Sequence, residues 1–136
     1  MTAVVRSSVP VVVKTGPGNG YLLFPHVGTK FLVLGRQGNE TRVGLSPDQT
    51  GWLDTSALTF LPPGSAPPRG ILGAVKLTAG PDSTTATFSL GEQVPYEIEE
   101  SADLRTVTVR LYNTTGYTNW MIYDSSDTFV RQARWR

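Results

Sequence analysis

The sequence predicts an all-β protein built from short strands. No window of about eleven residues carries the apolar stripe at i, i+3, i+4 and i+7 that marks an amphipathic helix. The 14 glycines and 10 prolines among 136 residues divide the chain into short segments separated by turn signals. Between these turns, β-branched runs and alternation of apolar with polar residues recur, as expected for strands that bury one face.

The first half contains a series of short predicted strands with turn residues between them. A glycine-rich cluster at residues 16–20 predicts a turn or a long loop after the first strand. Gly38 and Asn39 predict a hairpin turn, because both residue types adopt positive φ at little cost. The predicted strands of this half are Val11–Val13, Phe31–Leu34, Thr41–Leu45, Gly51–Leu53 and Leu58–Leu61.

A proline-rich segment, Pro62–Pro68, predicts the division of the chain. Prolines remove backbone donors and favour extended, semi-rigid geometry. We therefore predict one module over residues 1–61, a linker over residues 62–68 and a second module over residues 69–136. Modules of this size without disulfides bury too little surface to be stable alone, so we expect the two halves to share contacts.

The second half alternates more regularly, which predicts an antiparallel meander or sandwich. The alternation recurs over residues 71–78, 85–90, 96–99 and 106–111. The chain stops at Trp135-Arg136 within a predicted strand, so we expect the second module to be truncated there. In the first of these strands, one face is expected to carry Ile71, Gly73, Val75 and Leu77, and the other Lys76 and Thr78.

Charge and composition argue against several classes of partner. The chain has 12 basic and 11 acidic side chains, scattered along its length, whereas nucleic-acid binders concentrate their basic residues. No stretch approaches the roughly 18 apolar residues of a membrane span, and the N-terminus lacks the pattern of a signal peptide. The sequence contains no cysteine, so disulfides and thiolate metal sites are ruled out.

The sequence carries no recognisable pattern for catalysis or metal binding. A hydrolytic zinc site needs about three protein ligands, and His26 is the single histidine, interpreted as an ordinary surface residue. No G-x-S-x-G elbow is present. Glu97 and Glu99 lie two residues apart on a predicted strand, so they are expected to share a solvated face rather than form a glycosidase pair. We predict no catalytic residue, no metal and no cofactor.

An aromatic and amide-rich segment in the second half is the strongest candidate for ligand binding. Aromatic rings stack on the C–H faces of sugars and peptides, while amides and hydroxyls supply hydrogen bonds. The alternative is that these rings fill the core or cover a sheet end, and the sequence leaves both open. The candidate ligand-binding residues are Tyr112, Asn113, Tyr117, Asn119, Trp120 and Tyr123, with Tyr21 beside the glycine-rich cluster.

Residues 11–61 resemble a bacterial SH3 (SH3b) domain. The resemblance rests on Lys14-Thr15-Gly16-Pro17-Gly18, on Gly28-Thr29 before an apolar strand, and on Thr50-Gly51-Trp52-Leu53 near the end. It implies a small SH3-like barrel, with Trp52 plugging one end.

Residues 69–136 are similar to the AMIN-type β-sandwich that precedes the catalytic domain of some bacterial N-acetylmuramoyl-L-alanine amidases. The similarity rests on Gly70–Lys76, Thr84–Phe88 and Thr106–Tyr112. The implied fold is a small SH3-like barrel followed by an antiparallel β-sandwich or meander.

The order of the two resemblances implies a function. The chain would be the non-catalytic targeting region of a zinc-dependent cell-wall amidase in the periplasm or cell envelope. Its partners would be peptidoglycan, through glycan or stem peptide, and the downstream catalytic domain of the same chain. The alternative is a structural or regulatory module that packs on the catalytic domain without binding glycan.

Overall fold

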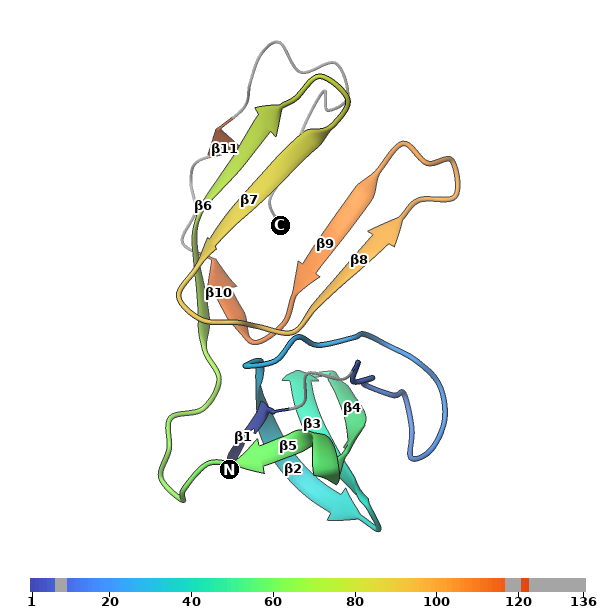
Figure 1. Cartoon of the computed structure of the whole chain (residues 1–136), viewed down its shortest axis with the longest axis vertical. Coiled ribbons are helices and arrows are strands. Elements are labelled where there is room, and N and C mark those ends of the chain that lie inside the picture. Colours follow the sequence, from blue (N-terminus) through green and yellow to red (C-terminus); the bar gives the residue numbers. More distant parts are fainter. Residues whose placement is uncertain (7–9, 117–120, 123–136) are drawn as a thin grey trace. The chain divides into compact units, whose positions relative to one another are not determined.

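The computed structural model describes residues 1–6, 10–116 and 121–122, and these residues form an all-β structure (Figure 1). The only helix in this part of the chain is the short 3-10 turn Thr55–Ala57. The predicted fold class is therefore confirmed. By their contacts the residues form two compact units, the first being Met1–Gly70 with Glu92–Thr114 and the second Ile71–Gly91 with Thr115–Arg136.

The first unit contains a five-stranded antiparallel sheet in the order β4-β3-β2-β1-β5. The last strand is only 3 residues long and pairs with β1 alone, so the described strands form an open sheet and not the closed barrel expected from the resemblance. Its strands are β1 (Thr2–Val5), β2 (Lys30–Gln37), β3 (Glu40–Ser46), β4 (Gln49–Asp54) and β5 (Leu58–Phe60).

The predicted hairpin at Gly38-Asn39 is confirmed as the connection between β2 and β3. Gln37 pairs with Glu40, which leaves a two-residue turn. Gly38 takes a φ of 59°, whereas Asn39 stays outside the left-handed region. Glycine at the first central position with positive φ is the pattern of a type II′ turn, whose twist matches the flanking strands.

The core of the first unit is apolar and draws on residues far apart in the sequence. Inward-facing residues alternate along β3, where Thr41, Val43 and Leu45 are fully buried. The buried cluster consists of Ala3, Val5, Val11, Val13, Leu23, Phe31, Val43, Leu45, Leu53, Ala57, Leu58 and Tyr112.

Residues 92–114 complete the first unit with the hairpin β8 (Tyr96–Glu100) and β9 (Val107–Leu111). Glu92 accepts a 2.9 Å hydrogen bond from Lys30 Nζ, and Tyr112 enters the core cluster. The two halves of the sequence therefore share contacts, as expected. The contacts group residues 92–114 with the first unit, whereas the sequence predicts a single boundary at residues 62–68. The predicted division into two modules stays a prediction.

The second unit is built around β6 (Gly70–Ala79), which pairs antiparallel with β7 (Thr84–Leu90). The short strands β10 (Thr114–Gly116) and β11 (Met121–Ile122) flank β6, and β11 runs parallel to it.

The predicted faces of β6 are correct for its second part and wrong for its start. Val75 and Leu77 are buried as expected, but Leu72 is buried while Ile71 and Gly73 are exposed. The register shifts between Leu72 and Val75, and such a bulge inverts which residues point to the core.

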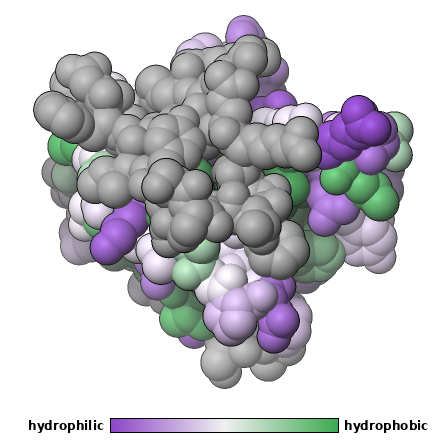
Figure 2. All heavy atoms as spheres, turned by 90° about the horizontal axis from the view of Figure 1, so that it is seen from above, coloured by the Kyte–Doolittle hydropathy of each residue, from purple (hydrophilic) through white to green (hydrophobic). Residues whose placement is uncertain are grey.

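The proline-rich segment at residues 62–68 contains no strand. Thr2 Oγ1 donates a 3.0 Å hydrogen bond to the Ala66 carbonyl, so the segment is attached to the start of β1. On the ungreyed part of the face in Figure 2, hydrophobic and hydrophilic residues are interspersed. No helix in the described part of the chain has the length and apolar character needed to cross a bilayer.

Candidate functional site

Tyr112 lies in the core of the first unit. Its side chain is 3% exposed, and its ring packs among the buried residues of the first sheet. Its hydroxyl donates to Glu97 Oε2 at 2.7 Å and lies 3.1 Å from Gln49 Oε1. Burial, together with the Glu97 carboxylate, raises the pKa of Tyr112. Of the two roles that the sequence left open for this ring, the structure places it in the core.

Asn113 holds the turn after β9 against the first sheet. Its φ of 51° lies in the left-handed region, which asparagine tolerates better than most residues. Its side-chain amide donates to the Gly44 carbonyl at 3.3 Å, and its backbone N–H donates to the Leu45 carbonyl at 3.3 Å. The amide group is therefore engaged by β3.

Tyr21, the candidate of the first half, is strongly exposed. Its side chain is 77% exposed and stacks on Phe24, which is 64% exposed, with ring centroids 6.4 Å apart and an interplanar angle of 18°. Phe24 is not among the candidate residues predicted from the sequence. The remaining candidates, Tyr117, Asn119, Trp120 and Tyr123, lie outside the described residues.

A second aromatic pair joins the same loop to the start of β8. His26 Nε2 lies 3.0 Å from the Tyr96 hydroxyl, and the two rings stack with centroids 5.9 Å apart. We define the aromatic strip as Tyr21, Phe24, His26 and Tyr96. Three of its members come from one loop, and the fourth comes from residue 96, which only the folded chain brings to it.

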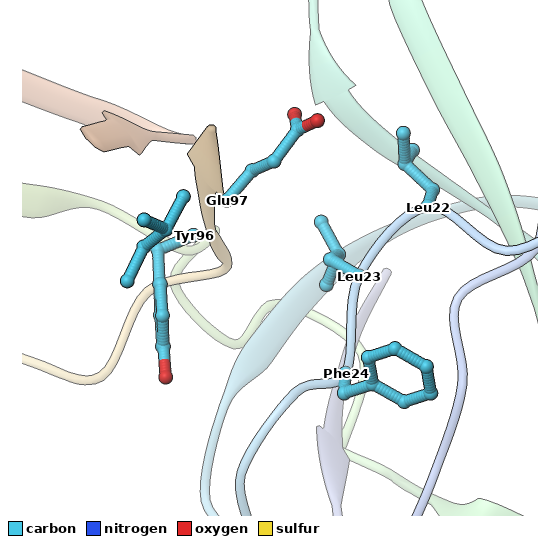
Figure 3. A pocket seen from close by; sticks show the side chains of 6 residues that line it. Leu22, Leu23, Phe24, Tyr96 and Glu97 are labelled. Carbon is cyan, nitrogen blue, oxygen red and sulfur yellow. The ribbon is translucent and has the colours of Figure 1, made fainter. Parts of the chain in front are cut away.

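A pocket of about 280 Å³ lies between this loop and β8 (Figure 3). In Figure 3, Leu23 points toward β8, and the Glu97 carboxylate extends toward Leu22. The walls are mostly apolar, and Glu97 supplies the one ionisable carboxylate. The lining residues are Leu22, Leu23, Phe24, Tyr96, Glu97 and Ile98.

Glu97 is more constrained than the solvated strand residue that the alternation predicts. Its side chain is 25% exposed, and its Oε2 atom accepts hydrogen bonds from Arg110 at 3.1 Å and from Tyr112. Glu99, two residues further along β8, is exposed as expected. The Arg110 and Tyr112 contacts fix the Glu97 carboxylate at the border of the pocket.

The other concentration of charge joins Lys14 to the start of β3 and the end of β4. Lys14 Nζ forms ion pairs with Glu40 and, at 2.9 Å, with Asp54. The hydrogen bond with Glu40, followed by that with Asp54, raises the pKa of Lys14. These groups satisfy one another, and among the described residues no group of three His, Cys, Asp or Glu side chains is arranged to hold a metal ion.

The pocket and the aromatic strip have the chemistry of a recognition surface. Exposed rings, an apolar recess and one oriented carboxylate can bind and orient a ligand. Comparison of the chain with protein-family models, with curated proteins and with solved structures found no match.

Proposed function

We propose that this chain is the non-catalytic targeting region of a bacterial cell-wall amidase and that it binds peptidoglycan, through its glycan or its stem peptide. The order of the SH3b-like and AMIN-like resemblances supports the proposal. In the same proposal, hydrolysis belongs to a zinc-dependent catalytic domain further along the chain, and the protein works in the periplasm or cell envelope.

The observation that carries the binding role is the exposure of the aromatic strip. Tyr21 and Phe24 are 77% and 64% exposed, although burying such rings is normally favourable. Clustered exposed apolar side chains on a folded protein mark surfaces that meet a partner. Ring faces suit the C–H faces of a sugar, and the neighbouring His26 and Tyr96 pair offers polar atoms for its hydroxyl groups.

Sedimentation with purified peptidoglycan tests the binding role. We expect the chain to be retained, and the double variant Tyr21→Ala/Phe24→Ala to bind roughly tenfold more weakly, as expected for two lost stacking contacts. Leu34→Ala is the matched control, because Leu34 is 48% exposed on β2 and lies outside the strip. If the folded wild type is not retained, or if both variants bind equally well, the strip is not the binding surface.

The alternative function, a brace for the catalytic domain, is favoured by a different observation. The β8–β9 hairpin exposes Ile98, Leu104 and Val107 by 58%, 76% and 61%, which suits packing against another domain. Comparing the amidase with and without residues 1–136 separates the two functions. Equal thermal stability combined with lost wall binding contradicts the bracing role, and the reverse result contradicts the targeting role.

A further inference from the structure

The hairpin β8–β9 is a two-stranded sheet, so one edge of β8 has no strand beside it among the described residues. Two backbone hydrogen bonds at the ends of the hairpin show which residues of β8 bond to β9 and therefore which residues face the open edge. Tyr112 N–H donates to the Pro95 carbonyl, and Ser101 N–H donates to the Thr106 carbonyl, both at 2.9 Å.

In an antiparallel pair, the residues that exchange hydrogen bonds alternate along the strand. Tyr96 lies opposite Leu111 and Glu100 lies opposite Val107. Since residues 95 and 101 bond across the hairpin, residues 97 and 99 between them also bond to β9. The N–H and C=O groups of Tyr96, Ile98 and Glu100 therefore point outward, and none of them has a backbone partner in the described part of the chain.

The pocket lies along this open edge. A pocket on a face of the hairpin would be lined by alternate residues of both strands. Instead it is lined by three consecutive residues of β8 and by none of β9. Its opposite wall is the segment Leu22–Phe24, which is itself extended and bridged to Val13 through Leu23 (Figure 3). The space is thus a slot between two extended segments of the same compact unit.

The side chains of β8 specify what could occupy the slot. One face of the strand presents Glu97 and Glu99, and the other presents Tyr96 and Ile98, with Ile98 58% exposed. Of the two acids, Glu97 is paired with Arg110, whereas Glu99 has no ion-pair partner among the described residues. A strand placed beside β8 would set its own side chains opposite these two faces.

Charge argues for a partner and against a second copy of this chain. Two β8 strands side by side would bring glutamates against glutamates, which is unfavourable for directly opposed residues. A strand with basic residues on one face and apolar residues on the other would meet Glu97 and Glu99 on the first and Tyr96 and Ile98 on the second.

We propose that the open edge of β8 binds an extended segment of a partner protein in which basic and apolar residues alternate, by strand addition. Main-chain hydrogen bonds to Tyr96, Ile98 and Glu100 would supply affinity, and the alternating side chains would supply specificity. The proposal goes beyond peptidoglycan binding, because the ligand is a polypeptide and the contacts are made by the edge of β8.

The first test measures binding of synthetic peptides to the full chain by fluorescence anisotropy. The probe is an acetylated and amidated eight-residue peptide of alternating lysine and valine, and the comparison is the same peptide with glutamate in place of lysine. We expect only the lysine peptide to bind, with slowed exchange of the amides of Tyr96, Ile98 and Glu100. Failure of both peptides to bind, or equal binding of the two, overturns the proposal.

The variants Ile98→Pro and Val109→Pro locate the binding edge. Proline at residue 98 removes an outward N–H without removing a bond to β9, and proline at residue 109 does the same on the opposite edge. With folding of both verified by circular dichroism, Ile98→Pro is expected to weaken binding at least tenfold and Val109→Pro to leave it unchanged. Equal effects contradict the assignment of the edge.

The Glu99→Lys variant tests the charge argument. Its expected effect is weaker binding of the lysine peptide and stronger binding of the glutamate peptide, and an unchanged preference contradicts the basic character of the partner. A wild-type dimer that Ile98→Pro dissociates would show that a second copy occupies the edge, which overturns the proposal. Retention on peptidoglycan should not change in Glu99→Lys, because Glu99 belongs neither to the pocket lining nor to the aromatic strip, so the two proposals fail separately.

Discussion

Replacing Tyr112 by alanine should destabilise the first unit strongly. A buried aromatic side chain removes about 150–250 Å² from water, worth roughly 4–6 kcal/mol at about 25 cal/mol per Å². Correcting for a compact unfolded chain lowers this value to about 3–5 kcal/mol, which matches the usual cost of emptying an aromatic site. Tyr112→Phe keeps the ring and loses the hydroxyl's hydrogen bond to Glu97, so about 1–2 kcal/mol is expected.

Urea unfolding followed by tryptophan fluorescence and far-UV circular dichroism measures both free energies of unfolding. Limited trypsin digestion gives a second measurement, because release of residues 92–114 should speed cleavage at Arg105, which is exposed between β8 and β9. A fall of less than about 1 kcal/mol in the free energy of unfolding of Tyr112→Ala would contradict a core role for this ring. The same role is contradicted if residues 1–61 alone are as stable as the full chain, because Tyr112 would then contribute nothing to the first sheet.

Two further predictions concern the first sheet itself. Gly51→Ala should cost about 1–3 kcal/mol, because a Cβ there would lie 2.4 Å from Val13 Cγ1, whereas Gly35→Ala, with no atom within 4 Å, should be close to neutral in the same urea titration. The raised pKa of Lys14 means that its ion pairs stabilise the folded state fully below the ordinary lysine value of 10.5, and that this contribution is lost as the pH rises through the folded pKa. Lys14→Met should therefore show a smaller loss of stability than the wild type between pH values of about 9 and 12, and parallel losses would contradict the role of the Glu40 contact.

Local sequence signals predicted the fold where the structure depends on neighbours in the chain. Gly38 predicted a tight turn, and the structure has that turn between β2 and β3. The start of β6 was predicted wrongly because a bulge adds a residue to one strand, and strict alternation carries no sign of where that occurs. The open form of the first sheet depends on which strands pair over long separations, and local patterns do not encode that pairing.

The candidate site was predictable only in part, for a similar reason. Exposure of Tyr21 fits its position beside a glycine-rich loop, and the positive φ of Asn113 fits the tolerance of asparagine for turns. The sequence left open whether Tyr112 lines a groove or fills a core, because its partner Gln49 lies 63 residues away. Phe24 stacks on Tyr21, its neighbour in the sequence. Tyr96 joins the strip through His26, which lies 70 residues earlier, and no local pattern predicts that contact.

The membership of residues 92–114 in the first unit has a consequence for synthesis on the ribosome. The hydrophobic interior of that unit stays incomplete until Tyr112 has left the exit tunnel, by which time every residue from 71 to 91 has already emerged. The core of the amino-terminal sheet therefore stays partly exposed while residues 71–91 are synthesised. A nascent chain released before residue 112 would expose that unfinished interior to chaperones and proteases.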